Sequence, residues 1–322
     1  MTPLLLALAL QAAAAQVQHA ACVYWTQPME SRAALEKSGV RHICVPPEQR
    51  EAWRAAGFDA NALTREALDA RLPLPAPGVA PRTGVASPTR APWIVANGWR
   101  IVRDPSAKYV YQVPAGRGAL AAAEAVAYGA DAVLQIDPAD LEPVGAVMSL
   151  ADSLAPANLP SVADIAVVDD GTAATGEVMN LLERRNLLFA IVKTPSPRYP
   201  INIALGSREY PVEDAADPSA FALEVRRRLT DEKRSLRVFG SEVVVCRFLS
   251  DGSRARLYLI NYGGREVQGL RLRLRGAFRG ADAQVAGAGR VALDDQSVAN
   301  GATEFSLPRL TTYAVVDLNA VR

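Results

Sequence analysis

Histidine, cysteine and lysine are scarce in this sequence. The 322 residues include 2 His, 3 Cys and only four lysines, against 31 arginines. A structural zinc site needs four Cys or His ligands and an iron–sulfur cluster needs four thiolates, so the composition argues against both, and we expect no metal and no cofactor. His19 and His42 are the only imidazoles, and the sequence has neither a G-x-S-x-G elbow nor P-loop spacing. Catalysis by a Ser–His–Asp triad or a Cys–His pair, and phosphate binding by a P-loop, are therefore disfavoured.

Long apolar runs are missing beyond the N-terminus. Residues 3–15 form an apolar run that ends in Ala13-Ala14-Ala15, an A-x-A-like cleavage site. This pattern predicts an export signal over residues 1–15 and a periplasmic or extracellular protein. Thirteen residues are too few to cross a bilayer and no later segment reaches 18 uncharged apolar residues, so we expect no stable membrane span after signal cleavage.

The three cysteines leave two questions open. Cys22 and Cys44 each lie in a short apolar run that is typical of a strand, so neighbouring strands would allow a disulfide. The alternative is that both are small buried hydrophobic side chains. Cys22 also follows the predicted signal closely, which leaves lipidation open.

Charge is balanced over the whole chain. The 35 basic and 34 acidic residues give a formal net charge of +1. No overall field attracts nucleic acid or an anionic membrane, and we expect no nucleic-acid partner. Half of the residues are hydrophobic and 21% are charged, which is typical of a folded globular chain.

Strand and helix patterns alternate through the first 230 residues. Apolar runs such as AVLQI, IAVV and LFAIV are typical of strands buried on both faces of a parallel sheet. Strands are predicted at 22–25, 40–45, 93–96, 108–113, 132–136, 165–168, 188–192 and 201–205, and helices at 30–37, 47–56, 118–128, 139–155, 175–186 and 219–229. This alternation indicates the α/β class.

Past residue 237 the helical period disappears. Strand patterns at 243–249, 255–261, 267–275 and 313–318 are joined by Asp251-Gly252 and Gly263-Gly264 turns. The predicted fold is therefore α/β, with a shortened barrel-like or open parallel region followed by a C-terminal antiparallel β-sandwich.

Basic residues are concentrated between residues 224 and 290, where fourteen arginines and one lysine face seven acidic residues. In the run LRLRLR the strand period places Leu270, Leu272 and Leu274 inward and the arginines outward. We interpret this as a solvated strand face, with a basic face for an acidic glycan as the alternative.

A glycine-rich turn gives one nucleotide-like pattern. Gly116-Arg117-Gly118-Ala119-Leu120-Ala121 fits G-x-G-x-x-A before a predicted helix, and Asp137 ends the next strand 21 residues after Gly116. Such a turn can hold a pyrophosphate at the helix N-terminus. Ordinary turn glycines explain the pattern as well, and an exported protein meets little soluble nicotinamide cofactor.

Carboxylates and aromatic residues at strand ends give the remaining chemistry. Glycoside hydrolysis needs two carboxyl groups across the scissile bond, and aromatic rings stack on sugars. The catalytic candidates are Glu124, Asp137 and Asp169, and the stacking candidates are Trp25, Trp93, Trp99 and Tyr111. Each also has a structural reading: Glu124 as a polar anchor, Asp137 and Asp169 as a helix cap and a turn residue, and the aromatic residues as core.

The C-terminal segments LYLINY (257–262) and FSLP…YAVV (305–316) resemble the terminal β-domain of bacterial glycoside hydrolases. With the segments IAVVDD (165–170) and INIAL (201–205), the chain resembles the beta-galactosidase type that has an amidotransferase-like middle domain. The resemblance implies a barrel-like α/β region over 16–160 with a proline-rich loop at 73–92, an amidotransferase-like segment over 161–236, and a β-sandwich domain over 237–322. In that family the middle domain mediates assembly and lacks the catalytic thiol, which leaves a homo-oligomer open.

A full (β/α)₈ barrel needs about 250 residues, whereas residues 16–160 offer far fewer, and no Asn-Glu dipeptide occurs. We therefore interpret the chain as a carbohydrate-associated protein, either a reduced hydrolase with paired carboxylates or a non-catalytic glycan-binding or assembly module. A structural or protein-interaction module without ligand chemistry is the alternative.

Overall fold

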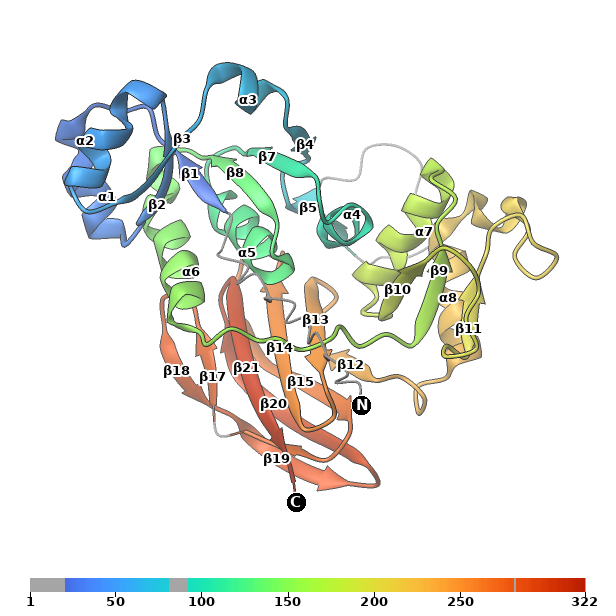
Figure 1. Ribbon diagram of the computed structural model, residues 1–322. Coiled ribbons are helices and arrows are strands. Elements are labelled where there is room, and N and C mark those ends of the chain that lie inside the picture. Colours follow the sequence, from blue (N-terminus) through green and yellow to red (C-terminus); the bar gives the residue numbers. More distant parts are fainter. Residues whose placement is uncertain (1–20, 81–91, 281, 322) are drawn as a thin grey trace, which may run out of the picture.

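The structure is a computed structural model that describes residues 21–80, 92–280 and 282–321. In these residues a larger α/β part comes first, a smaller α/β part follows, and antiparallel sheets end the chain (Figure 1). The fold class predicted from the sequence is confirmed. The predicted signal at 1–15 and residues 81–91 of the proline-rich stretch lie outside the described residues.

Six parallel strands form the first sheet, in the order β3-β2-β1-β8-β7-β4. Their bounds are β1 (Cys22–Tyr24), β2 (His42–Val45), β3 (Asp59–Ala62), β4 (Leu72–Leu74), β7 (Lys108–Gln112) and β8 (Asp131–Gln135). Val23 and Leu134, on the two central strands, are fully buried, as the apolar runs predicted. Because β3 and β4 are edges, this described sheet has the open form and not the barrel-like one.

Helices cover the first sheet. They are α1 (Arg32–Ser38), α2 (Arg50–Ala55), α3 (Arg65–Asp69), α4 (Gly98–Arg103), α5 (Gly118–Tyr128) and α6 (Leu141–Ser153), and β5 (Gly78–Ala80) pairs with β6 (Trp93–Val95) just before α4. Every residue of α5 from Gly118 to Ala127 is buried. None of the described helices is long and apolar enough to cross a membrane.

The second α/β part has three parallel strands, β10 (Phe189–Val192), β9 (Ile165–Val168) and β11 (Ile201–Ile203), with β9 in the middle. Helices α7 (Ala173–Arg184) and α8 (Pro218–Leu229) pack beside them (Figure 1). Val178, Met179 and Leu182 form the buried side of α7, as its apolar period predicted.

Two antiparallel sheets form the C-terminal part. One contains β12 (Leu236–Phe239), β15 (Val267–Arg275), β20 (Ala302–Leu310) and β19 (Asp294–Ala299). The other contains β13 (Val244–Ser250), β14 (Arg254–Asn261), β21 (Tyr313–Ala320), β17 (Asp282–Val285) and β18 (Gly289–Ala292), and β16 (Phe278–Arg279) pairs with β21. Side chains from both sheets share one core, which includes Leu257, Leu272 and Phe305. The sheets are thus layered face to face, as a sandwich requires.

The basic face of β15 is compensated within its own sheet. Leu270, Leu272 and Leu274 are fully buried, as the strand period predicted. On the opposite face Arg271 lies 2.5 Å from a Glu304 carboxylate oxygen, and Arg273 lies 3.5 Å from the other oxygen. This pairing favours a solvated strand face over a glycan-binding one.

Helix α5 connects the first part to the C-terminal sheets. Val245, Ile260, Tyr262 and Tyr313 belong to the same hydrophobic core as α5 and the first sheet. The segment after α6 also runs along the C-terminal part (Figure 1), where Ser161 forms a bridge with Leu249. The described parts therefore share buried contacts and are not joined by linkers alone.

Cys22 and Cys44 form a disulfide between the neighbouring strands β1 and β2. The sequence allowed either a disulfide or two buried thiols, and the structure contains the disulfide. Cys246 is free and buried on β13, where burial raises the pKa of its thiol. It is therefore a core side chain and not a reactive thiol.

Candidate functional site

Glu124 is a fully buried carboxylate on α5 with four hydrogen bonds. Its Oε1 accepts from the Asn97 amide nitrogen and the Tyr262 hydroxyl, both at 2.7 Å. Its Oε2 accepts from the Tyr111 hydroxyl at 2.7 Å and from Asn97 Nδ2 at 2.9 Å. Burial raises the pKa of Glu124, although these donors oppose the shift. The position favours the polar anchor over the catalytic acid, because both oxygens are buried and accept hydrogen bonds from the protein itself.

Asp169, which follows β9, is held in an ion pair with Arg103 of α4. Its two oxygens lie 2.7 and 3.0 Å from the guanidinium nitrogens, and one also accepts from the Gly171 amide at 3.0 Å. The Arg103 hydrogen bonds lower the pKa of Asp169, so the group stays ionised. A general acid needs the opposite shift.

Asp137 follows β8 and is exposed. Its Oδ1 accepts from the Ala139 amide at 2.9 Å and caps the short 3₁₀ helix Pro138–Asp140. The structure therefore gives Glu124, Asp137 and Asp169 separate partners on separate elements. None of the three lines either of the two pockets described below.

The glycine-rich turn before α5 is occupied by a side chain of the protein itself. Asp140 accepts from the Gly116 amide at 2.8 and 3.0 Å and from the Gly118 amide at 2.9 Å. A Cβ on Gly118 would lie 2.8 Å from the Asp140 Cβ. Because a carboxylate already sits where a phosphate would accept these hydrogen bonds, the turn is not arranged for a nucleotide.

The four aromatic candidates differ in exposure. Trp25, Trp99 and Tyr111 are buried, with at most 7% of their surface exposed. Trp93, at the start of β6, is 37% exposed and its ring carries the Arg184 guanidinium at 3.9 Å. Trp93 is therefore the one of the four candidates that is exposed.

Glu183 is an acidic residue that the sequence analysis missed. It lies in the last turn of α7 and is 7% exposed, with Oε1 accepting from the Tyr128 hydroxyl at 2.7 Å and Oε2 from the Trp99 amide at 3.0 Å. Burial raises the pKa of Glu183 to about 7. Met179 lies four residues earlier on the buried side of α7, and this helical spacing was the available signal.

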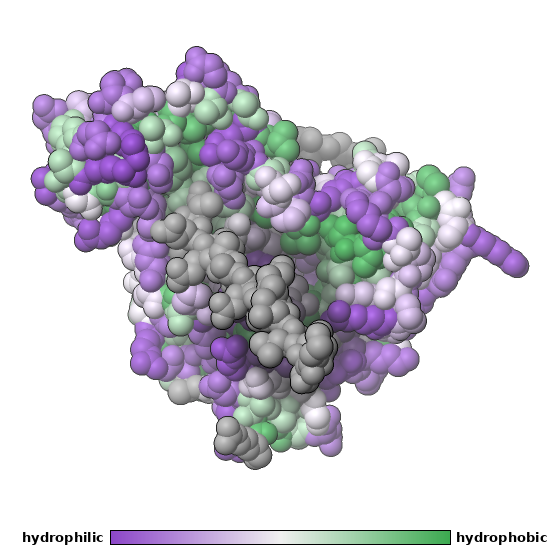
Figure 2. All heavy atoms as spheres, in the orientation of Figure 1, coloured by the Kyte–Doolittle hydropathy of each residue, from purple (hydrophilic) through white to green (hydrophobic). Residues whose placement is uncertain are grey.

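Glu183 lines a small pocket of about 80 Å³ between α4, β10 and β13. Its other walls are mostly apolar and include Trp99, Phe189 and Phe248. Figure 2 shows apolar surface around α4, where Val102 of the same lining is 38% exposed. Among the described residues, Glu183 is the only acid that lines this pocket, whereas glycoside hydrolysis uses two carboxyl groups.

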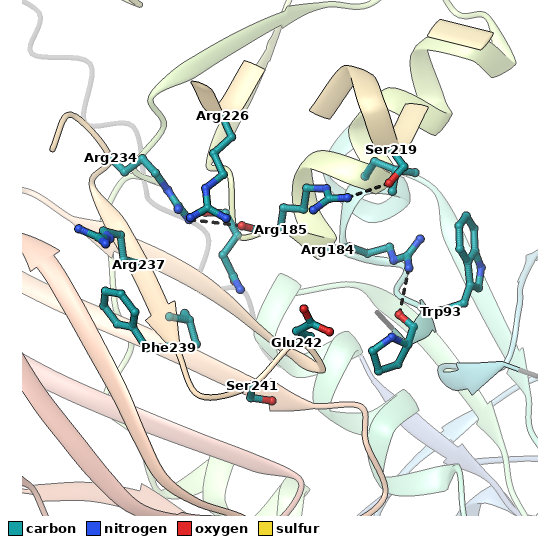
Figure 3. A pocket seen from close by; sticks show the side chains of 14 residues that line it. Trp93, Arg184, Arg185, Ser219, Arg226, Arg234, Arg237, Phe239, Ser241 and Glu242 are labelled. Atoms are coloured by element: carbon teal, nitrogen blue, oxygen red, sulfur yellow. Dashed lines mark hydrogen bonds between the residues drawn. The ribbon is translucent and has the colours of Figure 1, made fainter. Parts of the chain in front are cut away.

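A second pocket, of about 180 Å³, is rich in arginine (Figure 3). We call it the arginine pocket; it is lined by Arg184, Arg185, Arg226, Arg234 and Arg237 and also by Trp93, Ser219, Phe239 and Glu242. These residues come from β6, the end of α7, α8 and the β12 region. The cavity is smaller than the 300–1,000 Å³ or so that enclose drug-sized ligands, so it suits one ring or one anionic group.

Partial signals for the arginine pocket are present in the sequence. Three of its arginines fall in the basic stretch 224–290, but Arg184 and Arg185 precede that stretch by about forty residues in the sequence. Trp93, which also lines the pocket, comes from a still earlier segment of the sequence. Only the tertiary packing of α7, α8 and β12 brings these positions together.

No protein-family model matches this sequence, and no curated protein matches it. Among solved structures, alpha-L-fucosidase isoenzyme 2 from Paenibacillus thiaminolyticus is similar with a TM-score of 0.52 and 10% identity, over 85% of this chain and 70% of the fucosidase. Beta-galactosidases from Rahnella sp. R3 and Bacillus circulans sp. alkalophilus have TM-scores of 0.39 and 0.37, with 12% and 11% identity over 63% of this chain. This chain spans about half of those two, 51% and 52%.

The similarity shows that the described part of this chain shares its fold with the matched part of the fucosidase. At 10% identity it shows the fold alone. The beta-galactosidase type, the reduction of the catalytic half and the domain boundaries given in the sequence analysis stay predictions.

Proposed function

We propose that this protein is an exported, glycoside-hydrolase-like protein that binds a saccharide at the arginine pocket without hydrolysing it. The sequence predicts either a reduced hydrolase or a non-catalytic binding or assembly module, and we propose the non-catalytic alternative. The observation that carries the proposal is the position of Trp93, which is exposed at the pocket, whereas Glu124 and Asp169 are bound by other groups of the protein.

The linings of the arginine pocket and of the smaller pocket each hold a single acidic residue among the described residues, which supports binding over hydrolysis at these two pockets. Glycosidases hold two carboxyl groups about 5–9.5 Å apart across the scissile bond. Among the described lining residues, Glu242 is the only acid of the arginine pocket and Glu183 the only acid of the smaller one. Neither lining offers the acid and the nucleophile or base together.

Export is supported by the disulfide. Cys22 and Cys44 are bonded between the first two strands. Disulfides form and persist in oxidising compartments and are rare in the cytosol. The bond agrees with the predicted signal at 1–15, and a homo-oligomer stays a prediction.

The test is a binding and cleavage assay on the chain from Gln16 onward. We expect retention on at least one polysaccharide of a plant and microbial panel, with no new reducing ends. Trp93→Ala should weaken binding about three- to tenfold, because it removes the stacking surface. Leu72→Ala is the matched control, since Leu72 is 51% exposed on β4 and is not in the pocket lining.

Two results would contradict the proposal. Reducing ends that form with the wild type and disappear in Glu183→Gln would make the protein a reduced hydrolase that uses the smaller pocket. A failure to bind any polysaccharide of the panel would favour the structural or protein-interaction module.

A further inference from the structure

The arginine pocket has a large excess of positive charge in its lining. Among the described residues, five arginines and one acidic residue, Glu242, line it. In Figure 3 these side chains approach one another from different elements, with Arg226 and Arg234 on one side and Arg184 on the other. Like charges that converge from separate elements repel each other, so such a cluster needs a compensating anion.

Within the described residues, the ion pairs of Arg226, Arg234 and Arg237 all go to a single carboxylate. Asp231 lies 3.2 Å from Arg234, 3.3 Å from Arg237 and 3.4 Å from Arg226, so three guanidinium groups share one carboxylate. Asp231 is about one-third exposed, which weakens each pair by solvent screening.

Arg185 has no carboxylate within 4 Å among the described residues. Its Nη2 donates to the Ser219 hydroxyl at 2.7 Å instead. Burial and the charge of Arg226 lower the pKa of Arg185, while the charges of Glu242 and Asp217 oppose this shift. The group is thus a cation whose nearest polar partner is neutral.

Aromatic rings lie beside these cations. Trp93 is stacked with Arg184, and the Arg237 guanidinium lies 4.7 Å from the centre of the Phe239 ring. Both rings line the pocket. An apolar ring face next to guanidinium groups matches a sugar ring that carries an anionic substituent, because the ring stacks while the anion takes paired N–H donors.

We propose that the arginine pocket binds the carboxylate or sulfate group of an acidic saccharide, with Arg185 and Arg226 as its principal cationic contacts. This inference rests on the proposed saccharide binding and adds the chemical class of the ligand. Arg234 holds the pocket wall, since its Nη2 donates to the carbonyl oxygens of Arg185 and Asn186.

The experiment measures affinity for four probes by titration calorimetry: trigalacturonate, its neutral methyl ester, a sulfated oligosaccharide and inorganic sulfate. We expect trigalacturonate to bind at least about tenfold more tightly than the methyl ester, which is the effect of one charge-assisted hydrogen bond. Raising the salt concentration should weaken the binding of the acid only. A sulfated oligosaccharide that binds while trigalacturonate does not would assign the site to sulfate.

Variants locate the binding. Arg185→Gln and Arg226→Gln should each weaken trigalacturonate binding about tenfold. Arg227→Gln removes the same charge from the next position of α8, which is 74% exposed and outside the pocket lining, and should change affinity less than about twofold. Thermal unfolding of each variant establishes that the fold is retained.

The outcomes separate this inference from the proposed function. Equal affinity for the acid and its methyl ester, with loss of both in Trp93→Ala, would overturn the anionic ligand and leave saccharide binding standing. Inorganic sulfate that binds as tightly as trigalacturonate would overturn the saccharide assignment. Equal losses of affinity in Arg226→Gln and Arg227→Gln would show that the arginine pocket is not the binding site.

Discussion

At the residue scale, Glu124 is the clearest case of a side chain whose environment defines its role. Four donors point at its two oxygens, so replacing one oxygen by an amide group in Glu124→Gln sets donor against donor. We expect the free energy of unfolding to fall by about 2–4 kcal/mol. Urea unfolding measures this, with the exposed Glu142→Gln on α6 as the control. Equal stability of both variants would contradict the anchor role.

His42 is a second residue whose charge state affects stability. Its Nδ1 lies 2.9 Å from Asp59 and its Nε2 lies 3.0 Å from Asp152, which links β2 to β3 and α6. The hydrogen bond to Asp152 raises the pKa of His42 to about 9. A raised pKa means that the stabilisation is complete below the unfolded value of about 6.5 and is lost as the pH rises through 9.

We therefore expect the unfolding free energy of the wild type to fall by about 1–3 kcal/mol between pH 6.5 and pH 10 through this residue. His42→Gln should remove this fall, because glutamine does not titrate. Denaturant unfolding of both proteins at three pH values makes the comparison. Parallel pH profiles would show that the imidazole does not carry the effect.

At the scale of elements, the disulfide between β1 and β2 is the main covalent constraint. It closes a loop with a sequence separation of 22. Chain entropy predicts about 3 kcal/mol of stabilisation for a loop of this size. We expect reduction, or the double change Cys22→Ser with Cys44→Ser, to lower the melting temperature. The native protein should show no reactive thiol. After unfolding without a reductant, one thiol, that of Cys246, should react. Two more reactive thiols in that state would contradict the disulfide.

The elements were more predictable than the sites. Apolar runs predicted the strand at 132–136, observed as Asp131–Gln135, and the helix at 118–128 matches α5. These signals are local, since they depend on the period of buried side chains. The roles of Asp140 and Glu183 were missed because their partners, the Gly116 amide and the Tyr128 hydroxyl, lie far away in the sequence. The Arg185 environment likewise exists only after α7 and α8 pack.

At the scale of the whole molecule, the shared core around α5 predicts cooperative unfolding. All four tryptophans lie before residue 100, so their fluorescence reports on the N-terminal part, while far-UV circular dichroism also follows the C-terminal sheets. Tyr313 of β21 and Tyr262, which directly follows β14, belong to the core that includes α5. We expect the two probes to give the same urea midpoint, as two-state unfolding requires.

Tyr262→Phe tests the connection directly, because it removes only the hydroxyl that donates to Glu124 Oε1. We expect about 1–2 kcal/mol of destabilisation, with the fluorescence and dichroism midpoints shifting together. Tyr24→Phe on β1 is the control, since Tyr24 is only partly buried. If the sheets unfold separately, the two midpoints differ and Tyr262→Phe moves them by different amounts. That result would make the C-terminal sheets an independent folding unit that is docked on α5.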